Sequence, residues 1–182
     1  MRIIAGEAGS IVLKSIKNKK TRPTLDRVKE AMFSMLIPYL HNAKVLDLFS
    51  GFGGLGLEAL SRGALKTVFV ERSRKNINVI DENISRCNFG DKTEVVKADV
   101  FNFLEGNNEK FDLIIMDPPY KKEFGEKLLE KINQHKTLKN NGIIVIEHSK
   151  NEIIKSQHTF SKIKEKKYGD TKLAFFENRE EI

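Results

Sequence analysis

Short apolar runs that alternate with helical patterns are the feature of this sequence that most constrains its fold. From Lys44 onward, five runs rich in Val, Ile, Leu and Phe have the length of strands, and residues at helical spacing follow three of them. The predicted strands are 45–49, 67–71, 94–99, 111–117 and 142–147. Repeated strand–helix units predict an α/β fold with a mostly parallel sheet that helices cover on both faces.

Different patterns flank this core. Residues 160–168 and 171–177, joined by Gly169-Asp170, predict a hairpin whose last strand runs antiparallel to the sheet. At the other end, residues 2–6 and 10–16 predict a small hairpin. A helix follows, with Thr24 as its N-cap and Pro38 as its stop. We expect a single domain over residues 1–182, with 1–40 as an extension and 41–182 as the core.

Positive charge is concentrated near both ends of the chain, which carries a net charge of +7. Residues 1–30 hold eight Lys or Arg against three acids, and residues 150–172 hold seven lysines against three acids. This distribution indicates a polyanionic partner such as RNA, although a solvated surface is the alternative for both patches. The candidates for phosphate contact near the N-terminus are Lys17, Lys19, Lys20, Arg22 and Arg27.

The composition excludes several other classes of protein. The single cysteine, Cys87, cannot form an internal disulfide, and we interpret it as a small apolar residue of a helix. No apolar run reaches the roughly 18 residues of a membrane span, and the N-terminus lacks the apolar stretch of a signal peptide. The four histidines show no metal-ligand spacing. We expect a cytoplasmic protein without a metal.

A glycine-rich turn joins the first predicted strand to a helix. Residues 51–56 match G-x-G-x-x-G, and Glu71 lies 20 residues after Gly51 at the end of the second strand. Glycines let the backbone approach a nucleotide cofactor, and an acid in this position accepts hydrogen bonds from ribose hydroxyls. The pattern fits a dinucleotide as well as a nucleoside.

Two further acids bear on which cofactor binds. Asp47 immediately precedes the glycine turn, where a carboxylate would repel a pyrophosphate and favour a ligand with positive charge, such as S-adenosylmethionine. Asp99, at the end of the third predicted strand, could accept a hydrogen bond from an adenine amino group. Because parallel strands end at one edge of the sheet, we expect Asp47, Glu71 and Asp99 at a common ligand site.

Asp117-Pro118-Pro119-Tyr120 follows the fourth predicted strand at the same edge. The two prolines remove two N–H donors and leave an array of acceptors, namely the Asp117 carboxylate and nearby carbonyls. Tyr120 adds a flat face for stacking. This combination favours an exocyclic amino group of a planar base as the ligand.

These motifs together resemble class I S-adenosylmethionine-dependent amino-methyltransferases. The N-terminal hairpin, residues 21–31 and Tyr168-Gly169-Asp170-Thr171 are similar to the RsmD family of bacterial 16S ribosomal RNA guanine-N2 methyltransferases, from Arg2 to about Glu177. The resemblance implies a Rossmann-like, seven-stranded sheet with the last strand antiparallel. It also implies guanine 966, in the usual rRNA numbering, as the target, with a small-subunit assembly intermediate as one form of the substrate, and we expect a monomer. Phe52 departs from the small residue common in the glycine turn.

The resemblance also assigns roles to residues. Asp47 and the turn glycines Gly51, Gly53 and Gly56 would hold the methionine part of S-adenosylmethionine. Glu71 would bind its ribose, and Asp99 and Val100 its adenine. Phe49 and Arg72 are further expected cofactor contacts. At the target, Asp117 and the Pro118 carbonyl would hold the amine, Pro119 would fix the turn, and Tyr120 would stack on the base.

These motifs are compatible with other functions. Asp-Pro-Pro-Tyr serves any exocyclic amine, so adenine N6 in RNA or DNA is an alternative target. A nucleotide-dependent oxidoreductase would use the same glycine turn, and the basic segments alone would fit an RNA-binding module without catalysis.

Overall fold

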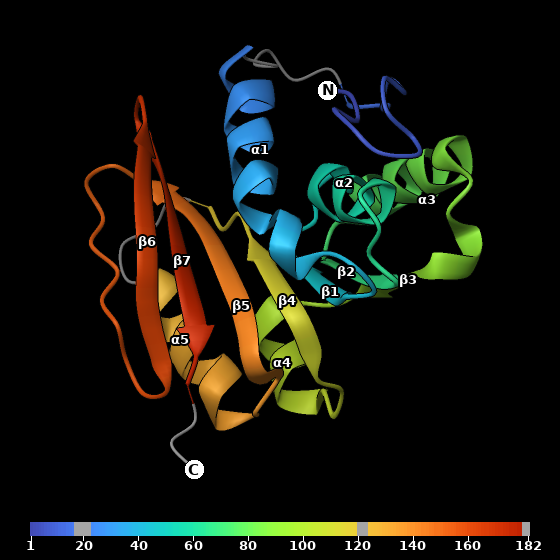
Figure 1. The fold of residues 1–182 in the computed structure, drawn as a ribbon. Coiled ribbons are helices and arrows are strands. Elements are labelled where there is room, and N and C mark those ends of the chain that lie inside the picture. Colours follow the sequence, from blue (N-terminus) through green and yellow to red (C-terminus); the bar gives the residue numbers. More distant parts are fainter. Residues whose placement is uncertain (17–22, 120–123, 180–182) are drawn as a thin grey trace.

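A computed structural model gives the fold of residues 1–16, 23–119 and 124–179 (Figure 1). Its centre is a seven-stranded sheet with the order β3-β2-β1-β4-β5-β7-β6. The strands are β1 (Lys44–Leu48), β2 (Lys66–Glu71), β3 (Thr93–Lys97), β4 (Phe111–Met116), β5 (Leu138–Ser149), β6 (Phe160–Tyr168) and β7 (Thr171–Asn178). The first five strands pair in parallel, and β7 pairs antiparallel with both β5 and β6. This is the predicted class I methyltransferase fold.

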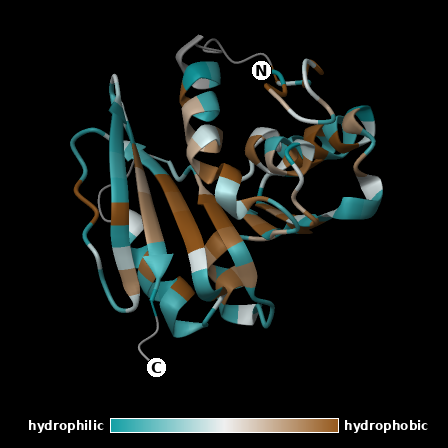
Figure 2. Ribbon diagram, viewed as in Figure 1, coloured by the Kyte–Doolittle hydropathy of each residue, from teal (hydrophilic) through white to brown (hydrophobic). Residues whose placement is uncertain are grey.

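Helices cover both faces of the sheet. The helices are α1 (Pro23–Leu36), α2 (Gly54–Ser61), α3 (Arg74–Cys87), α4 (Val100–Gly106) and α5 (Phe124–Gln134), with short 3-10 turns at Ile37–Tyr39 and Gly90–Lys92. Residues of α1, α2 and α3 share one buried cluster with the sheet, and residues of α4 and α5 share a second cluster on the opposite face. The brown central strands in Figure 2 lie between these two layers, so the core is buried from both sides.

The predicted strands are confirmed, with bounds that shift by a few residues. The largest change is in β5, which begins at Leu138 rather than at residue 142. β3 ends at Lys97, so Asp99 lies beyond the strand and caps α4, a helix that the sequence pattern did not predict. The C-terminal hairpin and its antiparallel last strand are confirmed.

The N-terminal segment differs from its prediction. Residues 1–14, here called the arm, contain one isolated antiparallel bridge, Arg2 to Val12, instead of two strands. The physical reason is that the N–H groups of Ile4 and Ala5 donate to the Glu58 carboxylate instead of to a strand partner. α1 begins at Pro23, so Thr24 lies in its first turn and is not the N-cap.

The arm and α1 pack onto the same core as the sheet. Ile3 and Leu13 of the arm and Met32 of α1 belong to the cluster that contains Val45 of β1. A single domain over the whole chain therefore stays our interpretation, with 1–40 as its extension. Cys87, the last residue of α3, is buried as predicted. No helix in the described part of the chain is long and apolar enough to span a membrane.

Candidate active site

A cavity of about 640 Å³ opens at the carboxyl ends of the central strands. Its walls come from the segments that follow β1, β2, β3 and β4, together with the first residue of α5. The lining residues are Phe49, Val70, Glu71, Arg72, Ser73, Asn76, Ala98, Asp99, Val100, Phe101, Asp117, Pro119 and Phe124. Open α/β sheets bind their ligands at this edge, so this cavity is the candidate site.

Glu71 organises the wall at the end of β2. Its buried carboxylate accepts a hydrogen bond from the Gly51 N–H at 3.0 Å and one from the Ser73 N–H at 2.8 Å. One oxygen therefore fixes the glycine turn, and the other fixes the start of α3. Each oxygen keeps a second lone pair, so Glu71 can still accept from hydroxyls of a ligand in the cavity.

Asp47 lies beneath the glycine turn, at the end of β1, and is not part of the cavity lining. Its carboxylate accepts a hydrogen bond from the Gly56 N–H at 2.9 Å. The pKa of Asp47 is raised to about 8, chiefly by burial and also by the nearby carboxylates of Asp117 and Glu71, while the Gly56 hydrogen bond acts to lower it. Asp47 thus holds the turn from below, and its contact with the methionine part of a cofactor stays a prediction.

The turn requires glycine at particular positions. Gly53 has a φ of +81°, which side chains rarely adopt, and a Cβ on Gly56 would lie 2.3 Å from the Phe69 ring. Phe69 belongs to β2, so Gly56 lets α2 pack directly against the sheet. These glycines shape the backbone around the cavity, although none of them lines it.

Asp117 stands at the end of β4, on the cavity wall. Desolvation at the strand ends raises the pKa of Asp117 to about 6, although its side chain is exposed to the cavity. Pro118 is buried behind the wall and Pro119 lines it. Asp117 is therefore a carboxylate acceptor at neutral pH and is protonated in mild acid.

Three aromatic rings form the apolar side of the cavity. Phe124 of α5 lies 5.6 Å from Phe49 and 5.4 Å from Phe101, centroid to centroid, in tilted and edge-on arrangements. Phe49 has a φ of +62°, an uncommon conformation for a bulky residue. Its ring packs against Phe124 and lines the cavity.

Asp99 lies across the cavity, exposed, at the N-cap of α4. Its carboxylate accepts a hydrogen bond from the Phe101 N–H at 2.9 Å, which leaves its other oxygen available to a ligand. Val100 and Ala98 add apolar surface next to it. No group of three His, Cys, Asp and Glu in the described ranges could hold a metal ion.

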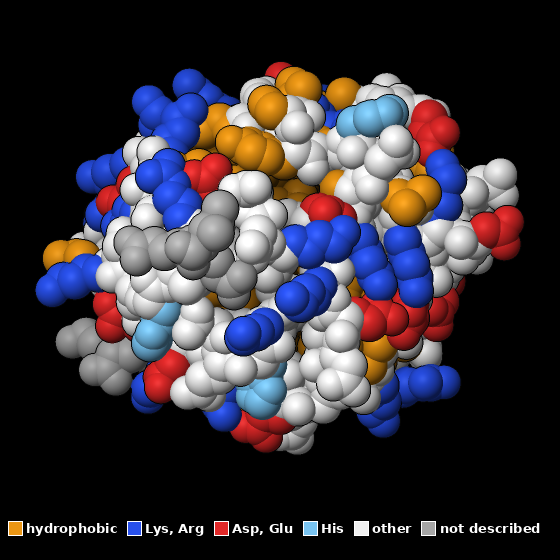
Figure 3. Space-filling model, turned by 60° about the horizontal axis from the view of Figure 1, so that its bottom comes forward, with side chains coloured by type: hydrophobic (Ala, Val, Ile, Leu, Met, Phe, Trp, Pro, Cys, Tyr) orange, Lys and Arg blue, Asp and Glu red, His pale blue; other side chains and the backbone are white. Residues whose placement is uncertain are grey.

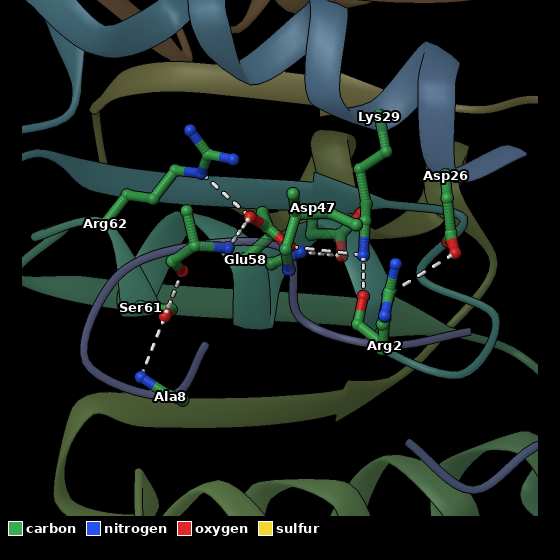
Figure 4. Close-up of polar contacts among 11 residues, drawn as sticks. Arg2, Ala8, Asp26, Lys29, Asp47, Glu58, Ser61 and Arg62 are labelled. Carbon is green, nitrogen blue, oxygen red and sulfur yellow. Dashed lines mark hydrogen bonds and ion pairs between the residues drawn. The ribbon is translucent and has the colours of Figure 1, made fainter. Parts of the chain in front are cut away.

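A buried network fixes the arm to α2, the helix that follows the glycine turn (Figure 4). Glu58 of α2 is fully buried and forms ion pairs with Lys29 of α1 at 3.2 Å and with Arg62 at 2.8 Å. Its oxygens also accept from two arm N–H groups, and Lys29 donates to the Arg2 carbonyl. The Ser61 hydroxyl accepts a hydrogen bond from the Ala8 N–H and donates one to the Ala5 carbonyl.

Asn83 of α3 joins the arm to the glycine turn itself. Its amide nitrogen donates to the carbonyls of Phe52 and Lys14, both at 3.0 Å, and its oxygen accepts from the Lys14 N–H at 2.7 Å. Asn83 is fully buried. The chain of contacts therefore runs from the cavity through Glu71 and Gly51 to Phe52, and from there through Asn83 to the arm.

The structure brings many of the predicted site residues together. Those that line the cavity are Phe49, Glu71, Arg72, Asp99, Val100, Asp117 and Pro119. Arg27 is exposed on α1, away from the cavity lining. Tyr120, Lys17, Lys19, Lys20 and Arg22 lie outside the described residues.

Other residues that line the cavity or support its walls were not predicted from the sequence. Ser73 and Asn76 could have been found from their position just after Glu71, because Ser73 caps α3 by accepting from the Asn76 N–H. Phe101 and Phe124 come from helices on the far face, and nothing local in the sequence marks them. Asn83 and Glu58 resemble ordinary polar positions of helices until the packing of the arm is known.

Comparisons with known proteins show to which family the chain belongs. A family model described as "Conserved hypothetical protein 95" matches residues 1–177. "Ribosomal RNA small subunit methyltransferase D" of Haemophilus influenzae is 33% identical to the chain, over 98% of this chain and 94% of that protein. The chain belongs to the RsmD family. Another relative of this RsmD-family chain is "Putative rRNA methyltransferase YlbH" of Bacillus subtilis, 35% identical over 98% of this chain and all of that protein.

Solved structures place the RsmD-family chain in the same fold. "Putative methyltransferase yhhF" from Escherichia coli superimposes with a TM-score of 0.89 at 27% identity, covering 100% of this chain and 99% of that one. An RNA methyltransferase from Salinibacter ruber, solved with S-adenosyl-L-homocysteine, has a TM-score of 0.67 at 16% identity, over 91% of this chain and 96% of that one. The second likeness concerns the fold alone.

Proposed function

We propose that this protein transfers a methyl group from S-adenosylmethionine to an exocyclic amine of 16S ribosomal RNA. The finer proposal is the N2 amine of guanine, at position 966 in the usual rRNA numbering. The observation that carries the proposal is the cavity that unites Glu71 and Asp99 with the Asp117 motif at one sheet edge. The names of the Haemophilus and Bacillus relatives support rRNA as the substrate.

The described residues fit S-adenosylmethionine. Glu71 offers two carboxylate oxygens for ribose hydroxyls, and Asp99 offers one free oxygen for an adenine amine. Phe101, Val100 and Ala98 give this end of the cavity the apolar walls that a planar base requires. When bound, S-adenosylmethionine supplies a methyl group activated by its sulfonium.

The Asp117 motif acts on the target amine. The Asp117 carboxylate and the Pro118 carbonyl accept the two N–H bonds, which orients the nitrogen lone pair and turns it out of conjugation with the ring. The prolines fix the backbone, so these acceptors are in place before the base arrives. Most of the rate enhancement then comes from proximity and orientation, with no covalent intermediate on the protein. We propose Tyr120 as the stacking surface for the base.

The arm and its basic continuation are the proposed RNA contacts. Lys17, Lys19, Lys20, Arg22 and Arg27 would contact phosphates next to the target loop. A base in a loop costs less to extrude than one in a duplex, so a 16S hairpin loop is the proposed substrate. The substrate could be an assembly intermediate of the small subunit, and the enzyme would act as a cytoplasmic monomer.

Nucleoside mass spectrometry tests the target base. Ribosomal RNA from cells that lack the protein should lose N2-methylguanosine at one site, and purified protein with labelled S-adenosylmethionine should restore it. Loss of N6-methyladenosine with intact N2-methylguanosine would assign the adenine alternative, which the same Asp117 motif could serve. NAD binding tighter than that of S-adenosylmethionine would refute the methyltransferase proposal.

A further inference from the structure

The edge strand β6 carries a bulge that decides where its lysines point. Lys162 is opposite Phe176 of β7, but Lys164 is opposite Phe175, so Ile163 is an extra residue in β6. A bulge of this kind reverses the faces of all residues beyond it. Lys162 and Lys164 therefore lie on opposite faces of the sheet, although their spacing in an uninterrupted strand would place them on the same face.

Beyond the bulge, one face of β6 carries Lys164, Lys166 and Tyr168. Their partners on β7 are Phe175, Leu173 and Thr171. Phe175 and Leu173 are buried in the cluster that α1 covers, and Tyr168 packs against the same cluster. Lys164 and Lys166 are nevertheless exposed, because they lie on the free edge of the sheet next to that cluster. We call Lys164, Lys166 and Tyr168 the β6 track.

The two lysines of the β6 track have no carboxylate partner among the described residues. The one acid of β6, Glu165, points to the opposite face, where it accepts from Lys162 and Lys172, both at 2.9 Å. By contrast, Lys44, Lys66 and Lys139 at the other end of the strands all pair with acids. The β6 track is thus a row of uncompensated positive charge that ends in a half-buried aromatic ring.

The β6 track leads toward the active-site edge. β6 runs in the same direction as β4, because each of β5 and β6 is antiparallel to β7. Tyr168 therefore lies at the end of the sheet that also carries Asp117. The turn after Tyr168 is fixed by Lys150, whose side chain pairs with Asp170 at 2.6 Å and whose N–H donates to the Asp170 carbonyl. In Figure 1 this turn and the first turn of α1 point to the same end of the molecule.

We propose that the β6 track binds the RNA strand next to the target base. Lys164 and Lys166 contact successive phosphates, and the exposed part of Tyr168 packs against a base or ribose, in the way that basic grooves with aromatic residues hold single strands. The inference rests on the proposed function, because it takes the RNA substrate as the partner. It extends the RNA contacts beyond the N-terminal segment to the β6 edge of the sheet.

The test compares the two lysines of the β6 track with two exposed lysines outside it. The track variant is Lys164→Ala with Lys166→Ala. The matched control is Lys155→Ala with Lys167→Ala, two exposed lysines off the track, of which Lys167 shares β6 but faces the other way. Binding of a fluorescent RNA carrying the predicted 16S hairpin loop is measured over a range of salt concentrations for wild type and both variants.

The expected result is a change in salt dependence for the track variant alone. The slope of log affinity against log salt should fall by about 1.4, because each lost phosphate contact on a single strand contributes about 0.7. Tyr168→Leu should weaken binding about tenfold with an unchanged slope, since stacking does not release counterions. Equal slopes for wild type and track variant, or equal reductions in track and control variants, would overturn the proposal.

Two further measurements separate this inference from its alternatives. Free edge strands often carry lysines that prevent aggregation, so light scattering is recorded for each variant. Aggregation of the track variant with an unchanged RNA slope would assign the lysines to edge protection and refute the RNA contact. Methylation of the wild-type complex is measured in parallel. If the track variant binds RNA with a reduced salt slope but the wild-type complex forms no N2-methylguanosine, the proposed function is refuted. The RNA contact of the β6 track then still stands.

Discussion

The two ends of the central strands differ in whether their charged residues form ion pairs. At the amino ends, Lys44 pairs with Glu109, Lys66 with Glu94 at 2.6 Å, and Lys139 with Asp112 at 2.8 Å. The lower side of the molecule, turned forward in Figure 3, accordingly shows blue and red side chains next to one another. At the carboxyl ends, Asp47, Glu71 and Asp117 gather without a Lys or Arg ion pair among the described residues.

The pKa values follow this difference. A hydrogen bond from Lys44 lowers the pKa of Glu109, whereas burial raises the pKa of Asp47 to about 8 and that of Asp117 to about 6. Surface pairs of the first kind contribute little to stability, and desolvated carboxylates of the second kind cost free energy when ionised. Acids with perturbed pKa values often cluster at functional sites, so this difference supports the proposal that the active site lies at the carboxyl edge.

Asp117→Ala should have the largest effect of the variants that test this difference between the two ends of the strands. Removing the acceptor should lower the methyl-transfer rate about 100- to 1,000-fold, the usual effect of losing one preorganised hydrogen-bonding group. Affinity for S-adenosylhomocysteine, measured by calorimetry, should change little. In wild type, the rate should rise with pH through about 6, because the carboxylate is the accepting form. A normal rate for the variant would remove Asp117 from the reaction.

Glu71→Ala should affect the cofactor instead. It removes the acceptor for ribose hydroxyls and frees the N–H groups of Gly51 and Ser73, so binding should weaken by about 1.5–3 kcal/mol. Calorimetry with S-adenosylmethionine measures the change. An unchanged affinity would show that the cofactor does not use the end of β2.

Asp47→Asn tests how much the ionisation of buried Asp47 lowers the free energy of unfolding. The folded-state pKa of about 8 lies above the unfolded value of 3.8, so wild type should lose about 1.4 kcal/mol of unfolding free energy per pH unit between these values. Asparagine keeps an oxygen for the Gly56 N–H and cannot ionise, so the variant should lack this slope. Urea unfolding at several pH values measures it. Parallel profiles for wild type and variant would contradict the raised pKa.

Two buried asparagines at opposite ends of the sheet allow a matched comparison. Asn83 bonds to the arm and the glycine turn, and Asn178 donates to the Leu138 and Lys139 carbonyls at the amino edge. Asn83→Leu and Asn178→Leu should each cost about 1–3 kcal/mol of stability. Only Asn83→Leu should weaken S-adenosylhomocysteine binding, by about fivefold, and speed amide exchange in the arm. Equal affinities in both variants would refute the link between arm and cavity.

The smallest effect is expected at the amino edge. Lys66→Ala removes an exposed ion pair with Glu94, so the free energy of unfolding should fall by less than about 1 kcal/mol and methyl transfer should not change. Thermal unfolding and the labelled-cofactor assay measure both. A large loss of activity would mean that the amino edge also contributes to the site.

Much of this outcome could be predicted from local sequence. The apolar runs located the strands, because a strand buried on both faces is apolar throughout. Acids and glycines directly after those runs had to gather at one edge, because parallel strands end together. Glu71, Asp99 and Asp117 were therefore found on the cavity wall without any knowledge of packing.

The sequence by itself determined the succession along the chain of the seven strands and of α1, α2, α3 and α5, and which segments reach the carboxyl edge, since both follow from patterns a few residues long. Only the tertiary structure decided that Asp47 supports the glycine turn from beneath, that Phe124 completes the wall, and that Asn83 joins the arm to the turn. It also decided, through one extra residue in β6, which lysines face which side of the sheet. Burial, register and contacts between distant segments depend on how the whole chain packs, and no local pattern encodes them.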